Sequence, residues 1–167
     1  MELRRYFLEQ LDRDGQASRK AIERLPDEIN GWKPHPRSME LGRLASLVAT
    51  MPGWVATMIG TEELDVANGG SLRAQSGKIT RESLLSQLDK GLSDARHALE
   101  NTTEEHLLKP WKLTMGPQVL SYRPRYMSIA DGALSHLAHH RGQLTVYLRL
   151  LDASVPAIYG PSADEHF

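Results

Sequence analysis

The stretch that decides the fold is SHLAHHRGQLTVYLRLL, residues 135–151. It continues an apolar pattern with helical spacing, which predicts one long amphipathic helix from about Met127 to Leu151. His136 and His140 are four residues apart, so their side chains should lie on one face of that helix. By helical angle this face points to the interior, because it also carries Ile129, Ala133, Leu144, Tyr147 and Leu151.

Three earlier segments show the same periodicity and predict three more helices. The first covers Glu2–Arg24 and is ended by Pro26. The second covers Met39–Ile59, and Pro52 inside it should kink or divide the helix because proline lacks a backbone N–H. The third, Thr80–Leu99, begins at a residue that is favoured as an N-cap.

These segments together predict an all-α fold, a four-helix bundle with an irregular loop or small hairpin about Met115–Gly116 before the last helix. Residues 1–155 should form this single bundle. Residues 156–167 should form a C-terminal tail that packs over the bundle end or hangs free. The NGG at 68–70 lacks the strand and helix of a phosphate-binding loop and is interpreted as a flexible loop.

The composition narrows the range of functions. The 167 residues include 20 basic and 21 acidic side chains, so no bulk field draws the chain to nucleic acid or to an anionic membrane. Cysteine is absent, which excludes disulfides, thiolate ligands and a cysteine nucleophile. The N-terminus lacks the apolar core of a signal peptide, and the sequence has no run of about 18 uncharged apolar residues. We therefore expect a cytoplasmic protein with no nucleic-acid or membrane partner.

The histidines of the last helix are candidates for metal binding. Zinc and nickel accept neutral imidazole nitrogen, and two histidines one turn apart can supply adjacent ligands without backbone strain. His139 is rotated away from His136 and His140, so we interpret it as a second-shell or interface residue. The alternative for all three is that they are hydrogen-bonded residues at the rim of the core.

Three further groups have both a functional and a structural interpretation. Three tryptophans could line a pocket or anchor the core: Trp32, Trp54 and Trp111. Three arginines near the histidines in sequence could bind an anionic group, or could be solvated or paired with local carboxylates: Arg123, Arg125 and Arg141. Two tyrosines could supply a hydroxyl to a pocket, and we assign no proton transfer to either: Tyr122 and Tyr126.

The chain as a whole resembles the DinB-like (DinB/YfiT-like) superfamily of bacterial four-helix bundles. The resemblance rests on WKPHPRSMELGRLA at 32–45, MPGW at 51–54, SHLAHHRGQLTVYLRLL at 135–151 and VPAIYGPSADE at 155–165. It implies a divalent ion, nickel or zinc, held by one histidine on the second helix and two on the fourth. The two on the fourth correspond to His136 and His140, and the third position, three residues after Leu44, is Leu47.

Leu47 departs from that pattern and changes the expected chemistry. Its side chain has no lone pair, so His136 and His140 would give an ion two protein ligands plus water, short of the three usual at a catalytic zinc. We therefore expect the ion to be weakly bound or absent. Leu47 also continues the apolar stripe of the second helix, which is ordinary core packing.

Two hypotheses about function follow. If the protein is an enzyme, the resemblance implies a metal-dependent thiol transferase, isomerase or hydrolase acting on a small-molecule or thiol substrate. The alternative is a non-catalytic helical-bundle protein that has lost its metal and binds a small molecule or a partner. A strip made of His139, Val146 and Leu150 on the last helix could support a homodimer or be covered by the C-terminal tail.

Overall fold

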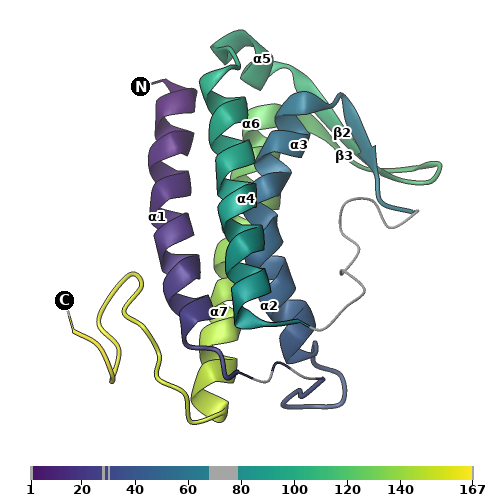
Figure 1. Cartoon of the computed structure of the whole chain (residues 1–167). Helices are drawn as coiled ribbons and strands as arrows, with labels where there is room; N and C mark the ends of the chain where they lie inside the picture. Colours follow the sequence, from purple (N-terminus) through teal and green to yellow (C-terminus); the bar gives the residue numbers. More distant parts are fainter. Residues whose placement is uncertain (1, 28, 30, 68–78, 167) are drawn as a thin grey trace.

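In the part of the chain that the structure describes, the helices are arranged as four columns that form the body of the molecule; Figure 1 shows their arrangement. The computed structural model describes residues 2–27, 29, 31–67 and 79–166. The columns are α1 (Leu3–Glu23), α2 (Leu41–Thr50) with η1 (Met51–Gly53) and α3 (Trp54–Gly60), α4 (Arg81–Glu100), and α6 (Arg125–Met127) with η3 (Ser128–Ser135) and α7 (His136–Leu150). The prediction of a mostly helical chain is therefore confirmed. The NGG at 68–70 lies outside the described residues.

Local sequence explains where the columns begin and bend. The first predicted helix agrees with α1 to within one residue at each end. α4 begins after Thr80, whose Oγ1 accepts from the Ser83 N–H at 3.1 Å while the Thr80 N–H donates to Ser83 Oγ at 3.0 Å. Pro52 divides the second predicted helix as expected, because α2 and α3 are joined by the 3-10 turn η1.

Two glycines, Gly53 in η1 and Gly91 in α4, lie where the turn at η1 packs against α4. A Cβ on Gly91 of α4 would lie 3.0 Å from the backbone nitrogen of Gly53, which is closer than side chains normally pack. Glycine at 91 therefore allows the two backbones to approach at the divided helix.

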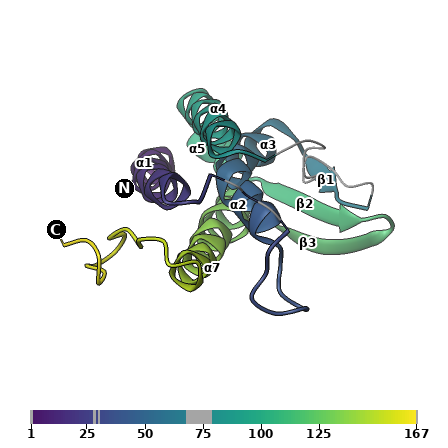
Figure 2. The same ribbon diagram turned by 60° about the horizontal axis from the view of Figure 1, so that its bottom comes forward.

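A small three-stranded sheet accompanies the helices, so a purely helical fold is not confirmed (Figure 2). Its order is β1 (Glu63–Asp65), β2 (Pro110–Met115) and β3 (Gln118–Pro124), with β1 parallel to β2 and β2 antiparallel to β3. The predicted hairpin is confirmed: β2 and β3 are joined through Gly116, whose φ of 56° favours glycine. β1 and the short helix α5 (Glu104–Leu108) were not predicted.

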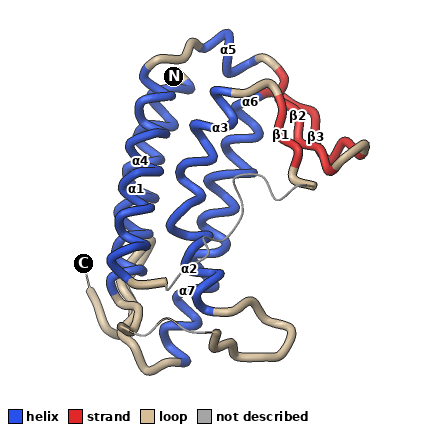
Figure 3. The backbone as a smooth tube through the Cα atoms, turned by 45° about the vertical axis from the view of Figure 1, so that its right-hand side comes forward, coloured by secondary structure: helices blue, strands red, loops and turns tan. Residues whose placement is uncertain are grey.

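The sheet lies to one side of the columns, next to α3 and α6 (Figure 3). Arg125, the first residue of α6, fastens it there with a fully buried guanidinium. This group donates to the carbonyls of Met58, Thr61 and Pro110 and to the Glu62 carboxylate, at 2.7 to 3.1 Å. The end of α3, the loop after it and β2 are thus joined through one side chain.

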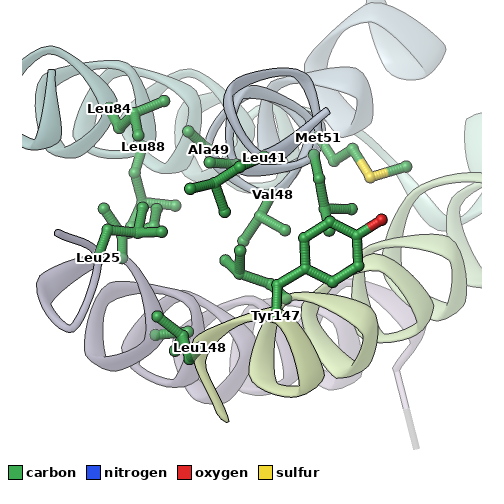
Figure 4. Close-up of a cluster of buried hydrophobic side chains, with 14 of the residues drawn as sticks. Leu25, Leu41, Val48, Ala49, Met51, Leu84, Leu88, Tyr147 and Leu148 are labelled. Atoms are coloured by element: carbon green, nitrogen blue, oxygen red, sulfur yellow. The ribbon is translucent and has the colours of Figure 1, made fainter. Parts of the chain in front are cut away.

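The core has two parts. One lies where α2, α4 and α7 meet and includes Leu41, Val48, Leu88, Tyr147 and Leu148 (Figure 4). The other connects α1, α3, α4, η3 and the sheet, and contains Phe7, Leu99, Ile129 and Trp111. Trp32 belongs to the first part of the core, where its ring packs edge-on against Tyr147 with 5.6 Å between the ring centroids.

The C-terminal tail is docked on α1 and α7. The Tyr159 hydroxyl donates to Asp14 Oδ1 at 3.0 Å and accepts from Arg141. Glu165 pairs with Lys20 at 3.1 Å, and Asp164 pairs with Arg149. The tail therefore lies along α1 instead of hanging free (Figure 1). Among the described residues, no helix is long and apolar enough to cross a bilayer.

Candidate functional site

The three histidines gather at the start of α7. The ring centroids of His136 and His140 are 4.6 Å apart, and those of His139 and His140 are 5.2 Å apart. Trp54, the first residue of α3, contacts the cluster because its ring lies edge-on to His136 at 5.9 Å. The predicted stacking of His136 and His140 on one face is thus present in the structure.

The two histidines differ in burial and in hydrogen bonding. His140 is 8% exposed, and its Nδ1 is 2.8 Å from Gln143 Oε1. A carbonyl oxygen can only accept, so the His140 Nδ1–H is the donor in this contact. His136 is exposed, so its expected place in the interior is not what the structure shows. His139 is exposed as well.

The pKa of His136 is lowered. Desolvation is the main cause, and the charge that His140 can carry adds to it. A backbone hydrogen bond to Gly132 acts in the opposite direction, and His139 lowers the pKa slightly. The neutral imidazole is therefore favoured, which leaves a nitrogen lone pair for a ligand.

The position to which the resemblance assigns a third ligand, Leu47, does not offer a donor. Leu47 is partly buried and packs on the core cluster that includes Leu44, Leu137 and Leu144. Within the described part of the chain, no three or more histidine, aspartate or glutamate side chains are grouped so that they could hold an ion. The residues present therefore do not fit a three-ligand metal centre, although His136 and His140 remain adjacent nitrogen donors.

The segment that leads into His136 is η3, a π-helical stretch. A π turn has more residues than an α turn, so it changes the angle between the residues before and after it. Within α7 itself the buried face includes Leu137, Leu144 and Leu148, and His136 lies at the edge of that face. Within η3, Gly132 faces α3: a Cβ there would lie 3.2 Å from the Met58 methyl carbon.

A pocket of about 260 Å³ opens between α3, the sheet and η3. Its walls are mainly apolar and include Trp54, Met58, Trp111 and Leu113. His136 also lines it, so the pocket and the histidine cluster are continuous. Two of the three tryptophans that the sequence offered as pocket residues are therefore in its wall. Trp111 is also a core anchor, with its indole N–H donating to Thr61 Oγ1 at 3.1 Å.

The three candidate arginines have separate roles. Arg123 lines the pocket, and its Nη1 donates to Asp131 Oδ2 at 2.7 Å. Arg125 and Arg141 are neither solvated nor paired with carboxylates nearby in sequence: Arg125 fastens the sheet, and Arg141 pairs with Asp14 at 2.8 Å with both side chains 1% exposed. Neither is available to an external anion.

The other candidates lie away from the pocket. Tyr122 is 66% exposed on β3, and Tyr126 packs on the second core cluster. The strip of His139, Val146 and Leu150 is exposed, so the tail does not cover it.

Sequence reasoning missed several pocket residues, among them Ser128 and Gly132. A glycine inside an otherwise helical pattern, as in IADGAL at 129–134, was the available signal, because such a glycine usually has a packing or functional reason. The serine carried no signal of its own.

Comparisons with known proteins agree with one another. The model of the DinB family matches residues 2–166. The uncharacterised protein YrdA of Bacillus subtilis (strain 168) is 23% identical over 160 residues, which is 96% of this chain and 90% of YrdA. The crystal structure of the DinB-like protein YjoA of Bacillus subtilis superimposes with a TM-score of 0.64 and 19% identity, over 89% of this chain and 94% of that one. The crystal structure of a DinB-like protein of Bacillus cereus ATCC 10987 superimposes with a TM-score of 0.64 and 20% identity, over 92% of this chain and 95% of that one.

Proposed function

The chain belongs to the DinB family, and on that premise we propose that it is a binding protein that holds a small, mainly apolar molecule in the pocket between α3, the sheet and η3. Its helical columns then act as a four-helix bundle that carries the sheet as one wall of the site. In this role the protein needs no tightly bound metal, because the pocket itself supplies the binding surface.

One observation carries the proposal: the pocket is open and mainly apolar, and it is continuous with a histidine pair that lacks its third partner. Small-molecule sites are typically concave and apolar with a few polar groups that orient the ligand. The indoles of Trp54 and Trp111 offer large, rigid apolar surfaces for such a ligand. A cavity of this kind in a purely structural wall would instead cost packing energy.

The metal side of the proposal depends on Leu47. With His136 and His140 alone, we expect zinc or nickel to bind weakly, because a structural or catalytic zinc normally has three or four protein ligands. Leu47→His should restore a third nitrogen donor and raise the affinity for zinc by at least about tenfold, the size of one good coordination contact.

Ligand binding and metal content test the proposal together. The protein is purified without a metal-affinity column, its metal is measured by elemental analysis, and ethylbenzene is titrated by ligand-observed NMR. We expect little metal in the wild type and in His136→Ala, and we expect ethylbenzene to bind the wild type.

A pocket-filling variant localises the binding. Gly132→Leu places its side chain toward Met58 in the pocket and should abolish ethylbenzene binding. Gly142→Leu is the matched control, because a side chain at Gly142 meets open space. If ethylbenzene fails to bind the wild type, or binds Gly132→Leu equally well, the pocket is not a binding site.

A second candidate function is a metal-dependent transferase, isomerase or hydrolase with a thiol or other small-molecule substrate. The observation that favours it is the pair of imidazoles whose ring centroids are 4.6 Å apart, in which burial lowers the pKa of His136 and so favours its neutral form. Near-stoichiometric metal in the wild type that disappears in His136→Ala would support this function and contradict weak binding.

Assembly is a separate proposal. The exposed strip of His139, Val146 and Leu150 offers an apolar face on α7 that a second copy could cover in a symmetric dimer. A monodisperse monomer by light scattering at high concentration would exclude it, and Val146→Glu should dissociate a dimer if one is found.

A further inference from the structure

A compact loop, residues 32–41, leads into α2 and projects past its start (Figure 2). The Leu41 N–H donates to the Trp32 carbonyl at 2.8 Å, so the two ends of the loop meet. Inside it, the Ser38 N–H donates to the His35 carbonyl at 2.8 Å and closes a turn. Surface loops whose ends adjoin are frequently functional. We call residues 32–41 the basic loop, for the charges described below.

The basic loop is anchored to the end of the last helix. The ring of Trp32 packs edge-on against Tyr147 of α7, with 5.6 Å between the centroids, and the Tyr147 hydroxyl donates to the Met39 carbonyl at 3.0 Å. Pro34 and Pro36 restrict the backbone between these two anchors. A partner that binds the loop therefore has little backbone left to order, which removes one cost of association.

The exposed cations of this region have no ion-pair partner among the described residues. Two are in the basic loop and one is in the first turn of α2: Lys33, Arg37 and Arg43. Most other exposed cations in the described part of the chain are paired, as Arg19 is with Asp89. Glu40 is the one carboxylate in residues 31–43, so this stretch has two more cations than carboxylates. The protein thus presents unbalanced positive charge on a rigid loop.

The three cations lie close enough for one short segment to reach them. Lys33 follows Trp32 directly, and Arg43 comes two residues after Leu41, so both adjoin the point where the loop closes. Arg37 is five residues from Trp32, which places its backbone within about 18 Å of that point at no more than about 3.6 Å per residue. An extended peptide of about six residues spans this length.

We propose that the basic loop and Arg43 form a docking surface for an extended acidic segment of a partner protein. Carboxylates of the segment pair with the three cations, which the chain itself leaves unpaired. The proposal goes beyond the function of the pocket and does not depend on it, since none of the residues that line the pocket belongs to 32–43.

The number of cations favours a peptide over nucleic acid or an anionic membrane. Proteins that bind nucleic acid through its backbone make about 6–10 phosphate contacts, and basic clusters that bind anionic lipids have about 4–8 lysines and arginines. This surface has three such residues, and the nearly neutral chain adds no long-range attraction for a polyanion. A short acidic segment, in contrast, needs only a few pairs.

Hexaglutamate is the probe that tests the proposal. It is titrated into the full-length, isotope-labelled protein, and amide NMR shifts are followed at low and at physiological ionic strength. We expect the amides of the basic loop to shift, and the affinity to fall several-fold as salt is raised, because exposed charges are screened. Hexathymidylate and vesicles of phosphatidylcholine with phosphatidylserine are measured under the same conditions and should bind more weakly.

A charge-removing variant localises the binding. It combines three substitutions: Lys33→Gln, Arg37→Gln and Arg43→Gln. Hexaglutamate should bind it at least about tenfold more weakly, the combined effect of three exposed ion pairs. The matched control removes the same charge from three exposed positions elsewhere: Arg5→Gln, Arg13→Gln and Lys109→Gln. Its affinity for hexaglutamate should stay within about twofold of the wild type. Unchanged amide spectra away from the substitutions show that both variants are folded.

Three results would overturn the proposal. If the two triple variants weaken hexaglutamate equally, net charge alone explains the binding and the basic loop has no special role. If hexathymidylate or the vesicles bind the wild type more tightly than hexaglutamate, the partner is not an acidic protein segment. If hexaglutamate shifts no amide of residues 32–43, this region is not a docking surface.

Discussion

The two halves of the last helical column differ in the hydrogen bonding of their buried polar groups. In α7, Arg141 is saturated: it donates to the carboxylate and backbone carbonyl of Asp14, to Ser18 and to Tyr159. In η3, Ser128 is equally buried and its hydroxyl has no partner. The saturated half joins α1, α7 and the tail, whereas the unsaturated half lines an open pocket. One half therefore stabilises the contact between α1, α7 and the tail, whereas the other half borders the pocket.

The largest effect should come from breaking the saturated half. Asp14→Ala leaves the buried Arg141 guanidinium without its carboxylate, and we expect the free energy of unfolding to fall by about 3–5 kcal/mol. Urea denaturation followed by circular dichroism measures it. Asp89→Ala is the control, because its ion pair with Arg19 is exposed and should contribute less than about 1 kcal/mol. Equal losses in the two variants would contradict the comparison.

Ser128→Ala should act in the opposite direction. It removes a buried hydroxyl without a partner, so the ligand-free protein should gain about 1 kcal/mol of stability in the same denaturation experiment. Ser46→Ala provides the contrast, since Ser46 Oγ donates to the Gly42 carbonyl at 2.8 Å and that bond is lost. A Ser128→Ala protein less stable than the wild type would show that this hydroxyl is satisfied in the free state.

Tyr159→Phe should weaken the saturated half slightly. The variant loses the hydroxyl that bridges Asp14 and Arg141 but keeps the direct ion pair, so we expect a loss of about 1 kcal/mol or less. Tyr122→Phe removes a hydroxyl from an exposed ring and should leave the urea midpoint unchanged. If the two substitutions have the same effect, the tail is not fastened through Tyr159.

The smallest effect that we expect is the response of the C-terminal tail to acidic pH. Hydrogen bonds from Arg149 and from the Val155 N–H lower the pKa of Asp164, and those from Lys20 and the Ala157 N–H lower the pKa of Glu165. Since the pKa of each is lower in the folded state, the contribution of these two carboxylates to docking of the tail is fully present above the ordinary carboxylate range of about 4 and decreases as the pH falls below it.

Amide NMR signals of Val155 and Ala157 report this titration directly. They should move at acidic pH in the wild type and lose that dependence in the Asp164→Asn, Glu165→Gln double variant. Unchanged titration in the double variant would assign the acid response to other groups.

The helices were predictable because their signals are local. Apolar periodicity indicated all four columns, Thr80 marked a cap, Pro52 marked the division of the second column, and Gly116 marked the hairpin. The strand β1 was missed because three residues cannot show an alternating pattern, and its parallel partner β2 lies far along the chain.

The candidate site was half predictable. The spacing of His136 and His140 gave their adjacency correctly, since that depends on one helical turn. The prediction that His136 faces the interior was wrong, because the argument left out Leu137 and Leu148, which shift the buried face of α7 away from His136. The unpaired state of Ser128 and the internal pairing of Arg125 and Arg141 depend on neighbours that are remote in sequence, so only the three-dimensional structure could reveal them.

The single guanidinium of Arg125 also bears on how fast a ligand can come and go. Through it, the end of α3, the following loop and β2 are tied together at one border of the pocket. Swinging the sheet outward would strip several partners from a buried cation, so we expect a preformed receptor that ligands enter and leave without an opening step. The rate at which ligands exchange should then depend on how tightly each one binds and not on a conformational step. A rigid pocket of this kind also selects ligands by their shape.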